Sequence, residues 1–347
     1  MSIKLLQIGV GIRGGHWAQF VKDHPDAECV GFVDPDPAGL EKARATVGDR
    51  PCAYFSDLDQ ALAATKADAA LVVSPTVLHA EHAMRALDAG LAVMVEKPLA
   101  ATVEEAAAVV QRAAAAGKPL LVAENYRFFP AERTVRALIE GGRIGRVDTA
   151  TLIDRRHMPS RTEGPWLASI EYPQLQEIAI HHFDSLRYFF EARPRSIALR
   201  AWNPPWSDYR NGANTEALID LDGVRVQYLG TMLSHRYGFS LWVEGEAGVI
   251  WTNRRQVFWR PGRSRFFRPV RLVKVPPGDA AKYPKGGTTS LLNSLRDAVQ
   301  HGTPGETRGE DNIWNVAMVE AGKLSHREGR TVRVEELMPE AALAGRS

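Results

Sequence analysis

Residues 177–184 read EIAIHHFD, a stretch with two carboxylates and two adjacent histidines within eight positions. On an α-helix Glu177, His181 and Asp184 would share one face, because they lie at i, i+4 and i+7. Such a face can transfer protons, hold a metal ion or form the polar edge of a packed helix. The spacing alone is compatible with all three, so the elements that position these residues must decide between them.

A second group of candidate residues lies near the N-terminus, where the apolar run 3–8 ends in GVGIRG. Gly9, Gly11 and Gly14 have the GxGxxG spacing of a turn that presents a helix N-terminus to a dinucleotide pyrophosphate. The next predicted strand ends at Asp34, where a carboxylate can accept hydrogen bonds from the adenosine ribose hydroxyls. The PDP segment after it brings a second acidic residue and no arginine, so a 2′-phosphate would be repelled. We therefore expect NAD as cofactor in preference to NADP.

Strand and helix patterns alternate through the first 125 residues, which predicts a doubly wound parallel sheet of the Rossmann type. Ligands of such sheets lie beyond the carboxyl ends of the strands. The polar residues predicted at that edge are Ser74, Pro75, Thr76, His79, Glu96 and Lys97. Pro98 disfavours helical geometry at Lys97, so the ammonium group should leave the strand end toward the crevice, where it can help to move a proton. An ordinary exposed lysine at a strand end is the alternative interpretation.

The pattern changes near residue 147 to short strands with turn signals, such as Asp222-Gly223 between two apolar runs. This predicts an α+β domain with a large, open, mostly antiparallel sheet, which packs against a helix over about 174–190 that carries HHFD. We expect three parts: a dinucleotide-binding domain over 1–125, a substrate-binding and oligomerisation domain over 126–334, and a polar tail over 335–347.

Length and composition narrow the function. A chain of 347 residues is too long for one ordinary core. Its net charge of +2 gives no reason to expect nucleic acid or a membrane surface as partner. Two cysteines and an N-terminus without a signal-like stretch predict a cytoplasmic protein. Neither His79 with His82 nor Glu177 with His181 completes a set of three ligands, so no metal site is expected.

The motifs together resemble a known family. GVGIRG, Asp34, SPTVLHAEHAMRALDAGLAVMVEKP, ENYRFFP and HHFD are similar to the glucose-fructose oxidoreductase, inositol dehydrogenase and MocA family of dehydrogenases. The resemblance runs from about residue 3 to about residue 334. It implies NAD(P)-dependent oxidation of a secondary alcohol on a sugar or cyclitol, and a homodimer or homotetramer formed through the C-terminal sheet.

The resemblance also implies roles for individual residues. It places Gly9, Gly11, Ile12, Arg13, Gly14, Asp34, Ser74, Pro75, Thr76, His79, Glu96 and Lys97 at the cofactor, and Tyr126 and Arg127 on the substrate side. His181 takes the acid/base position and Asp184 the position behind it. Much of the family has an aspartate where this chain has Glu177, so the substrate is where we expect this protein to differ from its relatives.

The mechanism that we expect has His181 remove the hydroxyl proton while a hydride passes from the carbinol carbon to C4 of NAD. Lys97 would stabilise the developing alkoxide, and Glu177 would accept a hydrogen bond from a neighbouring hydroxyl. Two alternatives remain open. One is transient oxidation of a glycoside that permits elimination of a neighbouring bond. The other is a dinucleotide-binding regulator without catalysis.

Three further features carry weaker predictions. Trp166 could line a carbohydrate pocket, although packing is the commoner role of a tryptophan. Arg155, with Arg156 and His157 beside it at the end of the first strand of the second domain, could bind a substrate carboxylate or hydroxyl, and a solvated strand end is the alternative. Residues 254–274 contain eight basic and no acidic residues, which we interpret as an exposed hairpin or a subunit contact. An anionic substrate reached by one of these arginines is the remaining possibility.

Overall fold

The computed structural model describes residues 2–159, 165–282 and 285–339. The chain forms two compact units, one from the residues up to Asn125 together with Pro276–Val316, the other from Tyr126–Val275 together with Ala317–Met338. The chain thus leaves the first unit after Asn125 and returns to it at Pro276. The predicted boundaries at residues 125 and 334 therefore differ from the observed units, because they assign Pro276–Val316 to the second domain.

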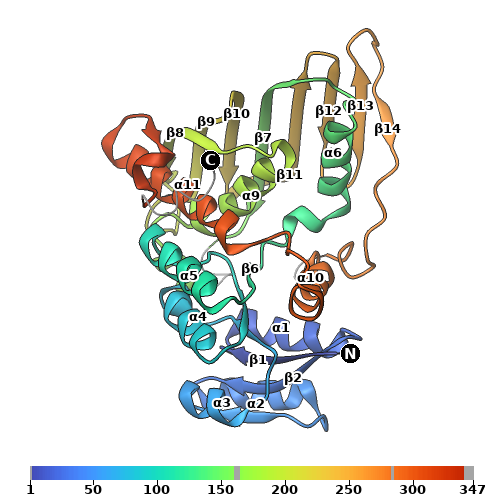
Figure 1. Cartoon of the computed structure of the whole chain (residues 1–347). Helices are drawn as coiled ribbons and strands as arrows, with labels where there is room; N and C mark the ends of the chain where they lie inside the picture. Colours follow the sequence, from blue (N-terminus) through green and yellow to red (C-terminus); the bar gives the residue numbers. More distant parts are fainter. Residues whose placement is uncertain (1, 160–164, 283–284, 340–347) are drawn as a thin grey trace. The chain divides into compact units, whose positions relative to one another are not determined.

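The first unit is built around a six-stranded sheet (Figure 1). Its strands are β1 (Ile3–Ile8), β2 (Ala27–Val33), β3 (Ala53–Phe55), β4 (Ala69–Val72), β5 (Ala92–Val95) and β6 (Leu120–Val122). The helices are α1 (Ile12–Asp23), α2 (Pro37–Val47), α3 (Leu58–Ala64), η1 (Thr76–Leu78), α4 (His79–Asp88), α5 (Val103–Ala116) and α10 (Thr288–His301). The strand order is β3-β2-β1-β4-β5-β6 and every pair is parallel, as in a Rossmann sheet.

Local sequence signals fix the helix ends in this unit. The side chain of Asp36 caps α2 by accepting from Ala38 N, and Thr102 caps α5 by accepting from Glu105 N. Gly117 ends α5 with a φ of 61°, a left-handed conformation that glycine adopts without steric cost. These ends place the loops that follow the strands at one edge of the sheet.

The second unit is built around a nine-stranded sheet in the order β14-β13-β12-β11-β7-β10-β9-β8-β15. Its strands are β7 (Val147–His157), β8 (Pro194–Trp202), β9 (Asn214–Leu221), β10 (Val224–Thr231), β11 (Leu233–Gly245), β12 (Gly248–Thr252), β13 (Val257–Pro261), β14 (Arg268–Val270) and β15 (Val332–Arg333). Only β7 and β10 pair in parallel among the described strands of this sheet. The predicted α/β fold class, with a parallel Rossmann sheet followed by a large and mostly antiparallel sheet, is confirmed.

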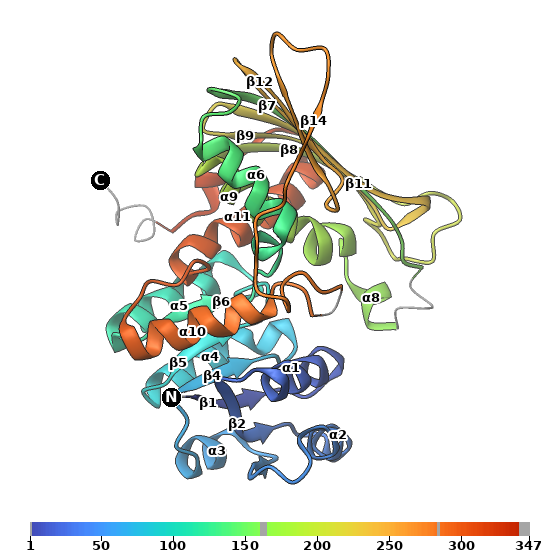
Figure 2. The same cartoon turned by 90° about the vertical axis from the view of Figure 1, so that its right-hand side faces the viewer.

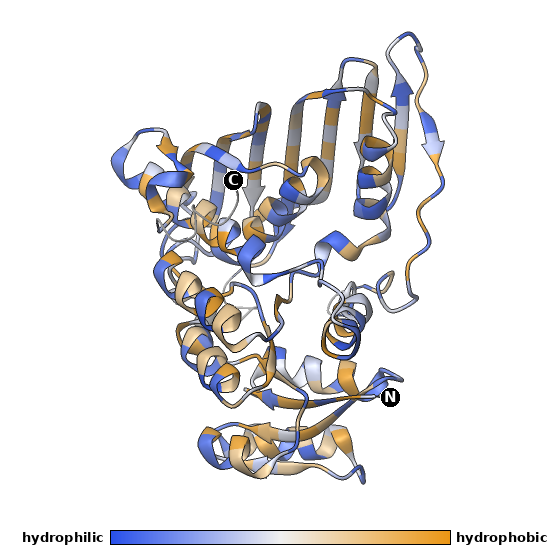
Figure 3. Cartoon of the chain, in the orientation of Figure 1, coloured by the Kyte–Doolittle hydropathy of each residue, from blue (hydrophilic) through white to orange (hydrophobic). Residues whose placement is uncertain are grey.

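Helices cover one face of the large sheet. They include η2 (Tyr126–Phe128), α6 (Pro130–Glu140), α8 (Pro165–Ser169), the π-helix η3 (Gln174–Ala179) and α9 (Ile180–Phe190). Figure 2 shows α6 and α9 on the same side of the sheet. Polar and apolar residues alternate along its strands (Figure 3), as expected where one face is packed and the other open. Leu218 and Trp242 lie on the open face, with 62% and 38% of their surface exposed.

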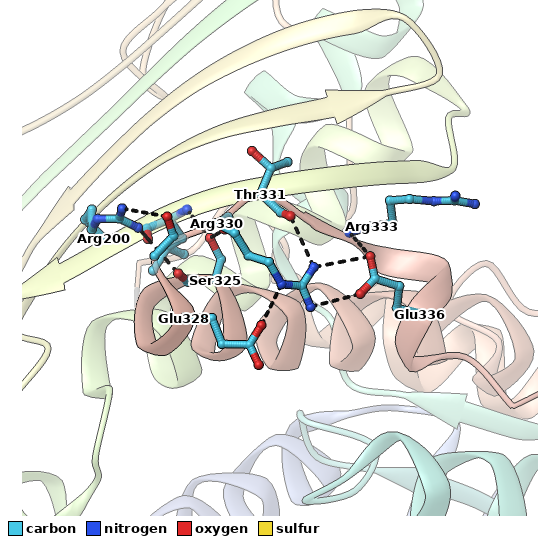
Figure 4. Close-up of polar contacts among 9 residues, drawn as sticks. Arg200, Ser325, Glu328, Arg330, Thr331, Arg333 and Glu336 are labelled. Atoms are coloured by element: carbon cyan, nitrogen blue, oxygen red, sulfur yellow. Dashed lines mark hydrogen bonds and ion pairs between the residues drawn. The ribbon is translucent and has the colours of Figure 1, made fainter.

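Polar contacts surround the end of the second unit, beside the place where the chain pairs with β8 (Figure 4). The last long helix, α11 (Gly309–Glu328), is followed by β15, which pairs with β8, and by the short helix η4 (Val334–Leu337). Arg330 donates to Glu328 at 2.6 Å and to Glu336 at 3.0 Å, while Arg200 on β8 donates to the carbonyl of Gly329 at 3.3 Å. These contacts lie beside β15, the last strand in the order of this sheet.

The helix that carries HHFD differs from the expected continuous α-helix. Its first six residues, Gln174–Ala179, form a π-helix, and the α-helical part begins at Ile180. Because hydrogen bonds span five residues in a π-helix, Glu177 and His181 do not have the regular i, i+4 relation. Within the described ranges, no helix combines the length and apolar character needed to cross a bilayer.

Candidate active site

The glycine turn of the first unit has the shape of an anion site. Gly9 has a φ of 98°, and a Cβ there would lie 2.6 Å from the backbone of Val73 and Ser74. A Cβ on Gly14 would lie 2.4 Å from the carbonyl oxygen of Gly9. Helix α1 begins at Ile12 without a side-chain cap and without an acidic residue in its first turn. Its N-terminal amides are therefore suited to a pyrophosphate, as the sequence predicts.

Asp34 lies at the end of β2, in the position expected of a ribose-binding carboxylate. One of its oxygens accepts from Val10 N at 2.6 Å and the other from Asp36 N at 2.9 Å. These bonds orient the carboxylate, and each oxygen keeps a lone pair for a further donor. Gly39 of α2 lies against the same side chain, since a Cβ there would be 3.5 Å from Asp34 Cγ.

His79 joins two loops at this edge of the sheet. The ring contacts the Pro98 carbonyl through Nδ1 at 2.7 Å and the Ser74 carbonyl through Nε2 at 2.8 Å. Burial lowers the pKa of His79, so the neutral ring donates to one of these carbonyls at a time. Pro75 is exposed and Thr76, the first residue of η1, is half-buried. The structure thus gives His79 a bracing contact between the two loops, whatever its relation to the cofactor.

Glu96 is a buried carboxylate with three donors. It accepts from Arg13 Nε at 2.5 Å, from Trp17 Nε1 at 2.7 Å and from the backbone N of Lys97 at 3.0 Å. Burial alone would raise the pKa of Glu96, but the positive charge of Arg13 and the bond from Trp17 outweigh it and lower the pKa to about 2. This carboxylate therefore ties helix α1 to the strand end that presents the half-buried Lys97.

In the second unit, His181 lies in a cluster of aromatic and polar side chains. Its imidazole is buried and stacks on the ring of Tyr126, with centroids 4.2 Å apart and an interplanar angle of 13°. The Tyr126 hydroxyl accepts from Arg156 at 3.0 Å, and Arg156 also donates to Asp154 at 2.6 Å. The predicted acid/base residue is thus packed against one of the residues predicted to line the substrate side.

Arg127 and Asp184, both predicted on the substrate side, bind each other. Arg127 Nε donates to Asp184 Oδ2 at 2.9 Å, and a second bond joins Nη2 to Oδ1. Both side chains are buried, so the pair is a two-point ion pair that fixes η2 against α9. Asp184 is therefore engaged by Arg127, one of the residues predicted on the substrate side.

Strand alternation brings Arg156 into the cluster in place of Arg155. Successive side chains of β7 point to opposite faces of the sheet, and Asp154, on the covered face, has Phe239 as its neighbour on β11. Arg156 shares that face, whereas Arg155 points to the open one. A period of two in the sequence separates Arg155 from Arg156, and the buried Leu152 and Asp154 show that the face of Arg156 is the packed one. Arg155 is therefore not placed with His181.

Two other residues predicted to bind substrate, Glu177 and Trp166, lie on short helices of the second unit. Glu177 lies on the π-helix and is half-buried. Trp166 belongs to α8, and its side chain lies outside the described part of the structure. Across the described ranges, no three His, Cys, Asp or Glu side chains are grouped to hold a metal ion.

His182 and Tyr228 belong to the site but were not predicted from the sequence. His182 is completely buried, and its Nδ1 lies 3.0 Å from the Tyr228 hydroxyl, to which Gln174 also donates at 2.7 Å. Burial and the charges of two nearby arginines hold the pKa of His182 well below its ordinary value. The second histidine of HHFD is therefore a neutral packing partner. In the sequence, the one indication of this difference is that adjacent residues of a helix point about 100° apart, so His181 and His182 face different surroundings.

A Rossmann sheet with a glycine turn and an acidic residue after its second strand is typical of NAD(P)-dependent dehydrogenases. Residues 3–124 match the family model described as an oxidoreductase family with an NAD-binding Rossmann fold, and residues 133–251 match the GFO/IDH/MocA C-terminal domain. The chain belongs to this GFO/IDH/MocA family of oxidoreductases. It is an NAD(P)-dependent enzyme that acts on CH–OH groups.

Individual relatives share nearly the whole chain. The uncharacterized protein y4oX of Sinorhizobium fredii is 30% identical, with 97% of both chains covered. D-apiose dehydrogenase of Paraburkholderia graminis is 27% identical over 96% of this chain and 90% of its own. An oxidoreductase from Agrobacterium radiobacter, solved with NAD+, L-tartaric acid and magnesium, has the same fold, with a TM-score of 0.87 at 20% identity over 97% of this chain and 100% of its own.

Proposed function

We propose that this protein is an NAD-dependent dehydrogenase that oxidises a secondary alcohol of a sugar, a sugar derivative or a cyclitol. The observation that carries the proposal is the polar cluster around His181, in a chain whose first unit has the glycine turn and Asp34 of a dinucleotide site. D-apiose dehydrogenase, a relative over nearly the full length, is named for a sugar substrate. The hydroxyl-rich class of substrate follows from that relationship.

The preference for NAD over NADP rests on Asp34. Its carboxylate is held by two backbone amides at the end of β2, and Asp36 follows two residues later. Both favour ribose hydroxyls, which can donate hydrogen bonds, over a 2′-phosphate, which would meet two negative charges. Titration of the protein with NADH and NADPH, followed by nucleotide fluorescence, tests this: NADPH binding equal to NADH binding would contradict it.

The chain's own residues supply the proton chemistry. An NAD held by the glycine turn and Asp34 would supply the acceptor for the hydride of the carbinol carbon. His181 accepts the hydroxyl proton through its imidazole, the side chain that most often serves as a general base. Tyr126 restrains the imidazole by stacking. Lys97 stabilises the alkoxide with its positive charge, and Glu96 fixes the backbone of Lys97.

The function is tested by a screen for NAD reduction, read at the absorbance of NADH, across cyclitols, aldoses, uronates and glycosides. We expect one class to give turnover. His181→Ala and Lys97→Met are then compared separately with the wild type on that substrate. If both variants oxidise it at the wild-type rate, the assignment of the two residues is wrong. NADH binding without turnover of any compound would favour a regulator instead.

We also propose that the open face of the large sheet joins copies of this chain into a homodimer or homotetramer. It carries the exposed Leu218 and a shallow depression of about 670 Å³ between β7 and β8. Exposed apolar surface of this kind on a sheet commonly marks an interface. Light scattering with size-exclusion chromatography tests this, since Leu218→Glu should give monomers. A wild-type protein that is monomeric at micromolar concentration would refute it.

A further inference from the structure

One arginine of the basic stretch 254–274 turns inward. Arg254 lies in the loop between β12 and β13, and only 16% of its side chain is exposed. Its Nε donates to Glu132 of α6 at 2.6 Å, and Glu132 is itself buried. The neighbouring Arg255 is exposed, as expected if the stretch forms an exposed hairpin or a subunit contact. Arg254 therefore needs a separate explanation.

The backbone of Arg254 is in an unusual conformation. Its φ is 67°, in the left-handed region that residues other than glycine seldom adopt. The turn around it is tightly bonded: Thr252 Oγ1 accepts from Arg254 N at 3.0 Å, and Asn253 Oδ1 accepts from Gln256 N at 2.8 Å. A strained residue persists only where its surroundings determine it, and such residues are concentrated at functional sites.

The side chain of Arg254 contacts the aromatic partner of His181. Its guanidinium carbon lies 4.4 Å from the centre of the Tyr126 ring and 3.9 Å from that of Phe239. The Tyr126 ring in turn stacks on His181 at 4.2 Å. Two arginines therefore hold one tyrosine, since Arg156 binds its hydroxyl and Arg254 contacts its ring face. A cation against an aromatic face is attracted by the ring quadrupole, most strongly where water is excluded.

The burial of Arg254 favours a positioning role over direct binding of a substrate. Arg254 Nη2 is buried and has no hydrogen-bond partner, and Glu132 Oε2 is in the same condition. A largely buried guanidinium that is paired with a carboxylate and packed on two aromatic rings is placed to support its neighbours. Its contact with the Tyr126 ring connects it to His181, because that ring stacks on the imidazole.

We propose that Arg254 is a positioning residue for the reaction: it holds the Tyr126 ring against the imidazole of His181 and so fixes the direction of the acid/base. This rests on the proposed function of His181. The positioning of the ring is nevertheless a property of the second unit alone and can be measured without turnover. The loop between β12 and β13, remote from HHFD in sequence, thereby belongs to the catalytic apparatus.

The variants separate loss of the contact from loss of fold. Arg254→Met removes the guanidinium but leaves Glu132 buried without its partner. The double variant Arg254→Met with Glu132→Leu removes both charges and keeps the volume. Arg254→Lys keeps the charge without the planar group, and Arg255→Met is the matched control in the same loop. Thermal unfolding of each variant shows which ones fold.

The first readout does not depend on activity. In protein with ¹³C-labelled histidine rings, the Hε1 resonance of His181, identified by its loss in His181→Asn, is shifted by the ring current of Tyr126. We expect this shift to decrease in Arg254→Met and in the double variant, to be partly retained in Arg254→Lys, and to be unchanged in Arg255→Met. An unchanged resonance in the folded double variant overturns the proposal, whether or not a substrate is known.

The second readout is kinetic and uses the substrate from the screen. Misplacement of an acid/base by about 1 Å costs up to about 100-fold in rate. We expect kcat of the double variant to fall between about 10-fold and about 100-fold, with KM changed less than about threefold. Arg254→Lys should recover part of this loss. A double variant whose kcat equals that of the wild-type protein overturns the proposal. If the wild-type protein oxidises no compound in the screen, the proposed function is refuted, and the His181 resonance alone then tests the role of Arg254.

Discussion

Replacement of Glu96 by glutamine tests whether this carboxylate ties the glycine-turn helix to the strand end that carries Lys97. In the wild type it accepts hydrogen bonds from Arg13, Trp17 and the backbone N of Lys97, and its pKa is about 2. Against an ordinary value of 4.5, and at about 1.4 kcal/mol for each pH unit, this corresponds to about 3 kcal/mol of stabilisation at neutral pH. The amide keeps one accepting oxygen, so we expect Glu96→Gln to lose about 2 to 3 kcal/mol.

The effect has a definite dependence on pH. A carboxylate whose pKa is lower in the folded state stabilises the protein fully above the pKa of the unfolded state, about 4.5, and loses this contribution as the pH falls toward 2. Between pH 5.5 and pH 3.5 the difference between wild type and Glu96→Gln should therefore shrink by about 1.4 kcal/mol. The remainder would disappear only as the pH approaches the folded-state pKa.

The assay is urea unfolding of both proteins, followed by tryptophan fluorescence and circular dichroism at several pH values. Glu104→Gln, at an exposed position of α5 in the same unit, is the control, and we expect it to change stability by less than about 0.5 kcal/mol. A loss below about 1 kcal/mol in Glu96→Gln at pH 7, or a loss that does not change with pH, would refute the reasoning.

Four further expectations follow from the same structure. Gly9→Ala should cost at least about 1 kcal/mol and weaken NADH binding, because its φ of 98° and the backbone 2.6 Å away exclude a Cβ; Gly15→Ala, with open space at that point, is the matched control, and fluorescence titration compares the two. Asp34→Asn should weaken NADH binding by about 10-fold and narrow the preference over NADPH, since the amide keeps one acceptor but loses the charge; equal ratios in both proteins would count against this. His182→Asn should reduce the acid sensitivity of unfolding below pH 6.5 by up to about 1.4 kcal/mol per pH unit, because a buried imidazole with a lowered pKa resists the proton that the unfolded chain accepts; parallel curves for both proteins would argue against it. Arg330→Ala should lower Tm by no more than about 2 °C, and by less at high salt, because its ion pairs are largely exposed; a large loss would mean that the network in Figure 4 determines the fold of that edge.

Features determined by residues close together in the chain could be predicted from the sequence. The glycine turn, the capped helices and the acidic residue after β2 depend on neighbours within about 25 positions, and the Rossmann order follows from their repetition. The two-residue turn at Asp222-Gly223 is observed with φ values of 50° and 96°, as its composition predicts.

Contacts between distant segments could not be predicted in this way. Glu96 is bound by Arg13 and Trp17, which lie about 80 positions away, and no pattern within either segment indicates the other. Tyr126, His181 and Arg254 meet in the same manner from three separate parts of the chain. Sequence reasoning can suggest that such residues act, but it does not show which of them support one another.

Arg155 and Arg156 show how far strand alternation leads from the sequence alone. Arg155 and Arg156 lie near the end of β7, and the alternation of a strand places only one of them on the face that carries Asp154. Alternation does not say which face is packed; the structure does, because Leu152 and Asp154 are both buried. The π-helix before Ile180 could not be predicted at all, because nothing in the sequence QLQEIA distinguishes it from the first turns of an α-helix.

The most direct test of the central claim is the rate at which His181→Asn oxidises the substrate found in the screen. General acid/base catalysis contributes about 10² to 10⁴ in rate, so kcat should fall by that amount, while the Kd for NADH should stay within about threefold of the wild type. A wild-type kcat in this variant would contradict the account, because the cluster around His181 would then have no part in the chemistry.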